Sequence, residues 1–169
     1  MEQEIVRDNF SIRKLQESEA LLYKSIRLEG LLAEPDLFRP NNPPEADLTD
    51  EEWKKKVSTP RFVFGLFCNG AIIGMTSFLL TNEDEAYLGQ SYIKKEFRGL
   101  GLSSLLYDIR FSWADKLGLK RLTISHKATN TISRSAIQRA GFVYTHTETI
   151  TWLDGTTGDS LLYALDLQQ

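Results

Sequence analysis

The sequence predicts an α/β domain built around a mixed, mostly antiparallel sheet. Three strand-like runs joined by tight turns lie in the first half of the chain and predict an antiparallel meander. A glycine turn then leads into a segment with helical periodicity, which is followed by another strand and a second helix. A strand–helix–strand connection crosses over the sheet, so it predicts locally parallel strands beside the meander. We assign residues 1–169 to one domain, because this length is typical of a single domain.

The elements before the meander are a strand, a helix, a loop and a short helix. Apolar residues alternate over 10–15 and predict the first strand, and Glu19 to about Leu32 has a helical period. Thr49 and Glu52 stand at capping-box spacing and predict the start of a short helix. The loop between the two helices is indicated by four prolines: Pro35, Pro40, Pro43 and Pro44.

The meander consists of three runs, 61–68, 71–80 and 86–93. Asn69-Gly70 joins the first two and is a strong signal for a tight hairpin turn. The polar segment 82–85 joins the second and third. Together these runs predict three consecutive antiparallel strands.

The second half of the chain alternates between helical and extended patterns. Apolar residues recur from Leu102 to Trp113 at the spacing of one helix face, and Gly118 predicts the end of that helix. The remaining predicted elements are a strand over 120–126, a helix over 131–140 closed by Gly141, and a final strand pair over 144–152 and 159–167 around Asp154-Gly155.

Composition excludes several classes of protein. With 41% hydrophobic and 25% charged residues, the chain has the composition of a globular protein. Its 20 basic and 23 acidic residues give a net charge of -3, which argues against a nucleic-acid partner. Cys68 is the single cysteine, so neither an internal disulfide nor a thiolate zinc site is expected, and we predict no metal site. No apolar run approaches 18 residues and the start is acidic, so we expect no membrane partner and a cytoplasmic location.

The segment 95–103, Lys-Glu-Phe-Arg-Gly-Leu-Gly-Leu-Ser, carries the clearest signal for a ligand. It lies where a predicted strand ends and an amphipathic helix begins. Gly99 and Gly101 let the backbone turn sharply, and the helix start offers unpaired N–H groups that favour a phosphate or pyrophosphate. Arg98 adds a cation and Ser103 a hydroxyl. The alternative is a tight turn without a ligand, and the glycine spacing alone does not decide between the two.

A second segment, 130–142, follows about thirty residues later and begins with Asn130. The two segments in this order resemble the GNAT superfamily of acetyl-CoA-dependent N-acetyltransferases. In that family a Q/R-x-x-G-x-G/A turn binds the pyrophosphate of coenzyme A, and an N-x-x-A/S segment followed by G-F lies beside the pantetheine. The order of elements from about residue 10 to 167 also matches the family.

The resemblance implies a GNAT-like fold, with helices on both faces of the sheet and two strands splayed at the coenzyme A site. Acetyl-CoA is then the expected cosubstrate. The main chain of the strand before the turn would hold the pantetheine and polarise the thioester carbonyl. The residues expected to bind the cofactor are Tyr92, Ile93, Arg98, Gly99, Leu100, Gly101, Leu102, Ser103 and Asn130.

Two residues depart from the family pattern. Glu96 stands where Gln or Arg opens the pyrophosphate motif. Ile137 stands seven residues after Asn130, where many members have a Tyr that is thought to protonate the departing thiolate. An isoleucine cannot donate that proton, so the general acid is left open.

His126 and Ser133 are the candidate catalytic residues. His126 ends a strand close to Asn130. An unperturbed imidazole titrates near neutral pH, so a histidine at this place suits a general base or proton relay. The alternative is a structural histidine bonded to a backbone carbonyl. Ser133 lies in the first turn of the second helix and is a candidate proton donor, while a capping role is the alternative.

The sequence therefore predicts acetyl transfer from acetyl-CoA to a primary amine by direct attack in a ternary complex, because no cysteine nucleophile is in evidence. The alternatives are transfer of a different acyl group and a non-catalytic module that binds acyl-CoA. The expected partner is a small-molecule amine or a peptide or protein amine. Members of the family often dimerise, so the resemblance also implies a homodimer as one option.

Overall fold

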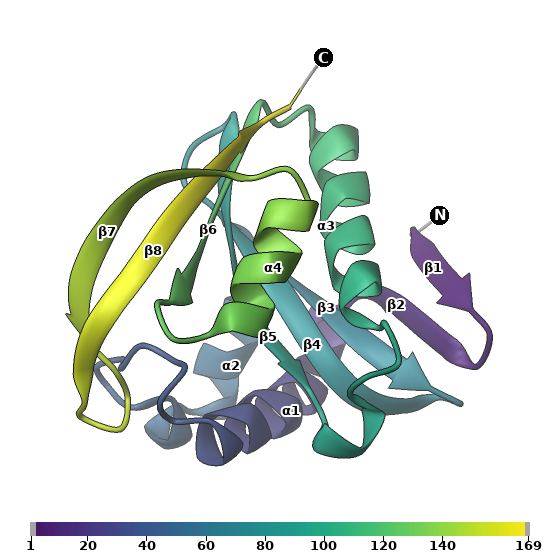
Figure 1. Cartoon of the computed structure of the whole chain (residues 1–169). Helices are drawn as coiled ribbons and strands as arrows, with labels where there is room; N and C mark the ends of the chain where they lie inside the picture. Colours follow the sequence, from purple (N-terminus) through teal and green to yellow (C-terminus); the bar gives the residue numbers. More distant parts are fainter. Residues whose placement is uncertain (1–2, 168–169) are drawn as a thin grey trace.

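The computed structural model of the chain describes residues 3–167, in which one eight-stranded sheet is covered by helices (Figure 1). The strands are β1 (Glu4–Arg7), β2 (Phe10–Lys14), β3 (Arg61–Cys68), β4 (Ala71–Leu80), β5 (Glu85–Ile93), β6 (Arg121–Lys127), β7 (Val143–Thr151) and β8 (Thr157–Asp166). The helices are α1 (Ala20–Ala33), α2 (Asp50–Lys56), α3 (Ser103–Leu117) and α4 (Thr131–Arg139), with 3₁₀ turns η1 (Glu17–Glu19), η2 (Glu45–Asp47) and η3 (Lys95–Phe97).

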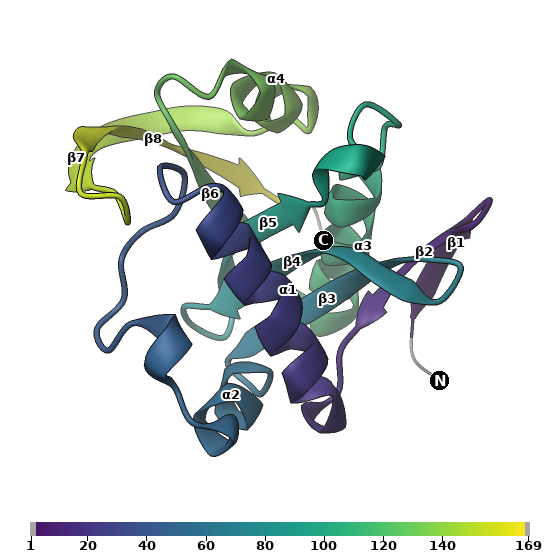
Figure 2. The same cartoon turned by 90° about the horizontal axis from the view of Figure 1, so that it is seen from below.

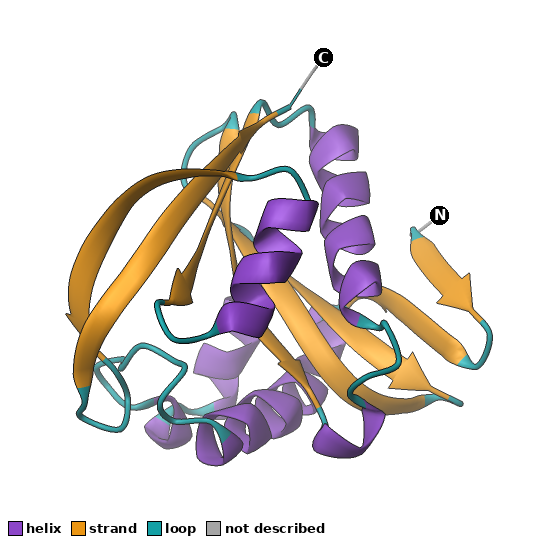
Figure 3. Ribbon diagram, in the orientation of Figure 1, coloured by secondary structure: helices purple, strands orange, loops and turns teal. Residues whose placement is uncertain are grey.

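The strand order in the sheet is β1-β2-β3-β4-β5-β6-β8-β7. Neighbouring strands are antiparallel except β5 and β6, which are parallel and connected through α3. The mixed, mostly antiparallel sheet with its meander and crossover is therefore confirmed (Figure 3). Strand β1 was not predicted from the sequence. It is only four residues long and joins β2 through a turn in which Asp8 has a φ of 56°.

The helices lie on both faces of the sheet, as the resemblance implied. Figure 2 shows α1 crossing one face of the central strands, with α3 behind them. Side chains of β3 alternate between the two faces, as the two-residue repeat of a strand requires. Phe64 and Leu66 belong to the core cluster that includes α3 and α4, whereas Val63 and Phe67 pack with α1 and α2. We call these sides the α3 face and the α1 face.

The predicted helix ends are confirmed at two places. Thr49 caps α2, because its Oγ1 accepts a hydrogen bond from the Glu52 N–H while the Glu52 carboxylate accepts one from the Thr49 N–H. Gly118 ends α3 in the left-handed conformation, with a φ of 69°. These signals hold because both depend only on residues next to one another in the sequence.

Strands β5 and β6 separate soon after they meet. Their register contains three pairs, Glu85 with Arg121 to Tyr87 with Thr123, and the strands then diverge (Figure 1). A bulge in β5 accompanies the divergence, because Gln90 has a φ of 56° and the register with β4 shifts between Met75 and Ser77. The sheet is thus open between two adjacent parallel strands, at the place where the resemblance predicts the splay.

The bulge also changes which residues of β5 face each side. Ala86 and Leu88 lie on the α3 face, so strict alternation would put Tyr92 there too. The extra residue at Gln90 reverses the alternation, and Tyr92 packs instead with α1. A bulge of this kind is not visible in the alternating pattern of the sequence.

Candidate active site

The glycine turn after β5 adopts a conformation that glycine tolerates best. Gly99 has a φ of 80° and Gly101 a φ of 75°. A Cβ added at either position would meet no atom within 4 Å, so the backbone angle, and not crowding, favours glycine.

The same turn presents a run of unpaired backbone donors. Within residues 3–167, the N–H groups of residues 99–104 donate no hydrogen bond, while the Arg98 and Leu105 N–H groups on either side do. Helix α3 begins at Ser103, so its positive end faces this turn. Consecutive N–H groups at a helix start form a binding site for a phosphate or pyrophosphate.

Two arginines contact the turn, and their contacts differ. Arg98 donates from Nε to the Ile93 carbonyl at 2.8 Å and pairs through Nη2 with Glu34 at 2.6 Å. Through these two contacts Arg98 links the end of β5 to the end of α1, so part of its charge is already neutralised by Glu34. Arg7 of β1 donates to the Gly101 carbonyl and to Ser104 Oγ. The sequence analysis missed Arg7, because the turn is ninety-four residues away along the chain and β1 itself was not predicted.

Tyr92 and Ile93 contribute their backbone, not their side chains, to the opening. The Tyr92 hydroxyl donates to the Glu29 carboxylate at 2.9 Å, on the α1 face. Burial and the neighbouring Glu29 raise the pKa of Tyr92 to about 12, so the phenol stays protonated at neutral pH. Ile93 is half-buried and its carbonyl accepts the Arg98 hydrogen bond.

A shallow pocket of about 220 Å³ lies between α3 and α4 and adjoins the turn. Hydroxyls from the start of α3 and a cation from α4 line it, beside aromatic carbon. Its lining residues are Ser103, Ser104, Tyr107, Asp108, Phe111, Ala136, Arg139 and Ala140.

The model of the acetyltransferase (GNAT) family matches residues 28–142 of the chain. The chain belongs to the GNAT acetyltransferase family. It is therefore an acetyltransferase, and its cosubstrate is acetyl-CoA. The comparison with curated proteins found no significant match.

Solved structures of GNAT proteins have the same fold. A GNAT-family acetyltransferase from Streptococcus pneumoniae has a TM-score of 0.77 at 22% identity, with 94% of this chain and 99% of that chain covered. The ribosomal-protein-S5-alanine acetyltransferase from Vibrio fischeri has a TM-score of 0.80 at 17% identity, with 97% and 96% covered. The ribosomal L7/L12 alpha-N-protein acetyltransferase RimL, in complex with coenzyme A, has a TM-score of 0.74 at 19% identity, with 96% and 97% covered. At these identities the likeness shows the fold.

The residues of this GNAT chain fit acetyl-CoA. Six unpaired N–H groups from residues 99–104 suit the pyrophosphate, with the Arg7 guanidinium beside them. The unpaired backbone edges of β5 and β6 beyond Tyr87 and Thr123 suit the amide-containing pantetheine arm.

The second GNAT motif begins at the N-terminus of α4. Asn130 Oδ1 accepts a hydrogen bond from the Ser133 N–H at 3.1 Å and so caps the helix. The Ser133 hydroxyl is half-buried and has no partner among residues 3–167. Ile137 is fully buried in the α3-face core, so apolar packing replaces the hydroxyl that many GNAT members carry there.

His126 is buried, with 5% of its surface exposed, and both ring nitrogens have partners. Nδ1 lies 2.7 Å from the Lys127 carbonyl oxygen, and Nε2 lies 3.0 Å from the Tyr163 hydroxyl. The ring shares the α3 face with Ile124, on the opposite side of β6 from Ser125. The Tyr163 hydroxyl is therefore the group that His126 Nε2 contacts.

Tyr87 and Ser125 form a hydroxyl pair that the sequence analysis did not connect. Their oxygens are hydrogen-bonded across β5 and β6, where the two strands begin to separate. The alternation of side chains along the strands could have indicated this contact. Tyr87 pairs in register with Thr123, and Ser125 lies two residues further along β6, so its side chain is on the same face. The pair lies on the α1 face of the opening.

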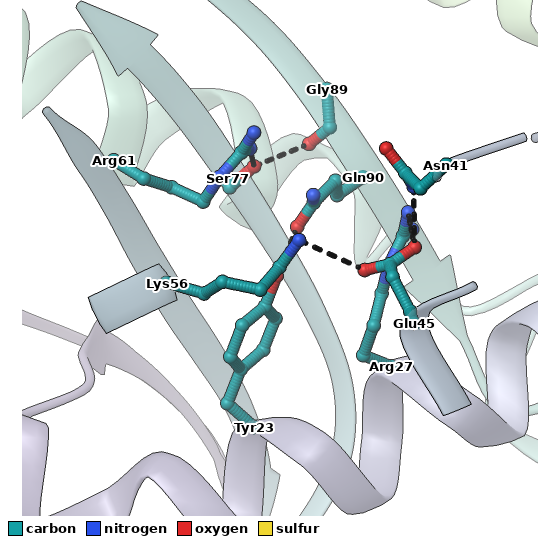
Figure 4. A network of polar contacts seen from close by, with 9 residues as sticks. All are labelled: Tyr23, Arg27, Asn41, Glu45, Lys56, Arg61, Ser77, Gly89 and Gln90. Carbon is teal, nitrogen blue, oxygen red and sulfur yellow. Dashed lines mark hydrogen bonds and ion pairs between the residues drawn. The ribbon is translucent and has the colours of Figure 1, made fainter. Parts of the chain in front are cut away.

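A partly buried polar network occupies the α1 face next to the bulge (Figure 4). The Tyr23 hydroxyl donates to Gln90 Oε1 at 2.7 Å, and Arg27 forms a bidentate pair with Glu45. The pairing of Arg27 with Glu45 was not identified from the sequence. The network contains Tyr23, Arg27, Asn41, Glu45, Lys56, Arg61, Ser77, Gly89 and Gln90.

The proline-bearing loop is anchored to the β7–β8 hairpin as well as to α1. Its Phe38 carbonyl accepts from the Leu153 N–H, and its Pro35 carbonyl accepts from the Asp154 N–H. The side chains of Trp53 and Trp152 are buried. Phe38 lies under the Arg27 guanidinium at 4.9 Å. The loop thereby closes over the α1 face of the sheet.

Proposed function

We propose that this acetyltransferase transfers the acetyl group of acetyl-CoA to a primary amine by direct attack in a ternary complex. The observation that carries the proposal is the opening between β5 and β6, which has the phosphate-binding turn at one end and a polar α1 face beside it. Acetyl-CoA supplies the activated acetyl thioester. The chain supplies position, a carbonyl-polarising backbone and a route for protons.

Direct transfer is supported by the location of the single cysteine. Cys68 ends β3 and pairs with Ala71 at the Asn69-Gly70 hairpin. Two strands, β4 and β5, separate β3 from the opening. A thiol in this place does not support an acetyl-cysteine route.

Ser133 is the proposed proton donor to the departing thiolate. Its hydroxyl is without a protein partner in the described chain and lies one helical turn before Ile137. His126 is kept as a proposed relay that acts through Tyr163, because its own nitrogens are both bonded. The Tyr87–Ser125 pair is a further route for the amine proton, since it lies on the α1 face.

The acceptor is proposed to be a primary amine on a small molecule or at the N-terminus of a protein. RimL and the S5-alanine enzyme, which share the fold, are named for the acetylation of ribosomal proteins. None of the helices within residues 3–167 has the length and hydropathy needed to span a bilayer. The homodimer, the cytoplasmic location and the assignment of residues 1–169 to one domain stay predictions.

The test is a thiol-release assay with acetyl-CoA and a panel of amines and N-terminal peptides. We expect release of free coenzyme A with at least one class of amine, together with mass-spectrometric detection of the N-acetylated product. Saturable binding of acetyl-CoA without turnover on the whole panel would contradict the proposal. Turnover with another acyl-CoA in preference to acetyl-CoA would change the donor but not the reaction.

Gly99→Ala tests the cofactor turn in the same assay, because Gly99 stands at the position of the motif that is glycine alone. A non-glycine residue at a φ of 80° costs about 1–2 kcal/mol, so we expect the dissociation constant for coenzyme A to rise about tenfold. Gly70→Ala is the matched control, because Gly70 has a φ of 84° in the β3–β4 hairpin. It carries a similar strain and should leave the affinity unchanged. Equal affinities for both variants would rule out the turn as the pyrophosphate site.

A further inference from the structure

The network on the α1 face contains more positive charge than it neutralises. Arg27, Lys56 and Arg61 enter it from α1, α2 and β3, and Glu45 is its one carboxylate among the described residues (Figure 4). Three cations and one carboxylate give a formal charge of +2. Removing a charge from water costs free energy unless an opposite charge lies next to it.

Glu45 has no capacity left for a further cation. Its carboxylate accepts two hydrogen bonds from Arg27 at 3.0 and 2.9 Å and one from Asn41 at 2.8 Å. Lys56 Nζ adds an ion pair at 3.3 Å. The side chains of Arg27 and Glu45 are 5% and 2% exposed, so this pair is sealed from solvent.

Arg61 lies beside this saturated pair without a carboxylate of its own. Its Nη1 donates to Ser77 Oγ at 3.2 Å, and within residues 3–167 it forms no ion pair. Ser77 in turn donates to the Gly89 carbonyl at 3.2 Å, which ties the arginine to the bulged part of β5. Burial lowers the pKa of Arg61 and also that of Lys56, in agreement with a site that lacks negative charge.

The excess charge is next to the place where the proposed reaction occurs. Gly89 and Gln90 form the bulge from which β5 leaves β6, and Tyr87 with its Ser125 partner is on the same face. Gln90 accepts from Tyr23 through Oε1, while its Nε2 donates to no residue within 3–167. In Figure 4 the nitrogen ends of Lys56 and Arg61 point toward this part of β5.

We propose that Arg61 and Lys56, with the Gln90 amide, bind a carboxylate of the acceptor, so that the substrate is an amine that carries a carboxylate, of the amino-acid type. The guanidinium is planar and matches a carboxylate through two parallel hydrogen bonds. The bound carboxylate supplies the missing negative charge and holds the amine at the opening between β5 and β6. This inference rests on the proposed function.

The experiment compares α-amino acids with their carboxamides and decarboxylated amines in the thiol-release assay. We expect the best acceptors to carry the carboxylate, and their carboxamides to have a kcat/KM at least tenfold lower, as the loss of a charge-assisted hydrogen bond predicts. Arg61→Met should remove this preference by raising KM for the acid more than KM for the carboxamide, so that the ratio of the two kcat/KM values approaches one. Arg61→Lys should restore part of it.

Lys54→Gln is the matched control, since Lys54 is on the same helix as Lys56 and pairs with the exposed Glu51. It should leave the preference intact, and thermal unfolding of each variant separates binding effects from loss of fold. Efficient turnover of amines that lack a carboxylate, with no gain from adding one, would overturn the inference while leaving acetyl transfer in place.

The absence of turnover with every amine would instead contradict the proposed function. In that case calorimetric titration of the same amino acids into the protein saturated with coenzyme A decides the inference. Binding that Arg61→Met weakens at least tenfold supports the carboxylate site, and no binding overturns it.

Discussion

The two faces of the sheet bury charge in opposite ways. On the α1 face, Arg27 and Glu45 form a sealed bidentate pair that belongs to a larger polar network. The core of the α3 face is apolar, yet it also contains a buried cation, Arg110, which is 1% exposed. Arg110 donates from Nε to the Leu106 carbonyl of its own helix, and its Nη1 has no partner in the described chain.

The difference shows what a buried charge does in each place. On the α1 face, charged groups from a loop, two helices and one strand gather beside the opening between β5 and β6. On the α3 face, the Arg110 guanidinium rests over the Tyr107 ring at 4.8 Å and forms no ion pair with a carboxylate of residues 3–167. Burial lowers the pKa of Arg110 to about 10, because desolvation disfavours the charged form. The buried arginine of the α1 face thus has a carboxylate partner, whereas the buried arginine of the α3 face has none among the described residues.

The largest expected effect is from Glu45→Ala. The variant leaves the buried Arg27 and the neighbouring Lys56 without a counter-charge, and breaking such a pair costs about 3–5 kcal/mol. Urea denaturation of the variant and the parent measures this difference. The double variant Glu45→Leu with Arg27→Met removes both charges and should recover most of the loss. If Glu45→Ala lowers the free energy of unfolding by less than about 1 kcal/mol, the α1 face does not depend on its buried ion pair and the contrast with the α3 face is wrong.

A smaller effect on the same pair is expected from acid. Burial acts to raise the pKa of Glu45, but Arg27 and Lys56 outweigh it and hold the pKa below the ordinary value of 4.5. A carboxyl whose pKa is lower in the folded state stabilises the fold above its unfolded pKa, and this contribution is lost as the pH falls through the folded pKa. The free energy of unfolding should therefore decline below about pH 4.5, and less steeply in the double variant, which lacks the Glu45 carboxylate. Identical acid profiles for both proteins would show that Glu45 makes no such contribution.

The smallest effect is expected from Arg110→Met. Methionine fills a similar volume without a charge, and such replacements are often neutral or stabilising. We expect a change within about 1 kcal/mol of the parent, in contrast to Arg27→Met, which strands the Glu45 carboxylate. Urea denaturation of the two arginine variants side by side measures this. A loss of several kcal/mol for Arg110→Met would show that the α3 face also depends on its buried charge.

The sequence predicted those features that local chemistry determines. These features are the strands of the meander, the Thr49 cap, the Gly118 helix end and the sharp turn at Gly99 and Gly101, all of which depend on neighbouring residues. The family motifs led to the candidate cofactor turn in the same way.

The features that the sequence analysis missed depend on residues far apart in the chain. Arg7 reaches the turn across ninety-four residues, and Glu45 returns to α1 through a loop with four prolines. The Gln90 bulge reverses the alternation that a regular strand would have, so the face of Tyr92 could not be read from parity. Contacts of this kind are decided by the folded topology, and no local pattern encodes them.

The limited contact between β5 and β6 has a consequence for how the molecule unfolds. Three residue pairs join a five-strand block, β1–β5, to a three-strand block, β6–β8. The backbone hydrogen bonds between β5 and β6 therefore contribute little to holding the two blocks together. Both blocks contribute side chains to the α3-face core, and this shared core makes them unfold cooperatively. A ligand that lies between β5 and β6 would protect the backbone N–H groups of both strands while it is bound. Amide hydrogen exchange in β5 and β6 therefore measures the fraction of protein that carries the ligand.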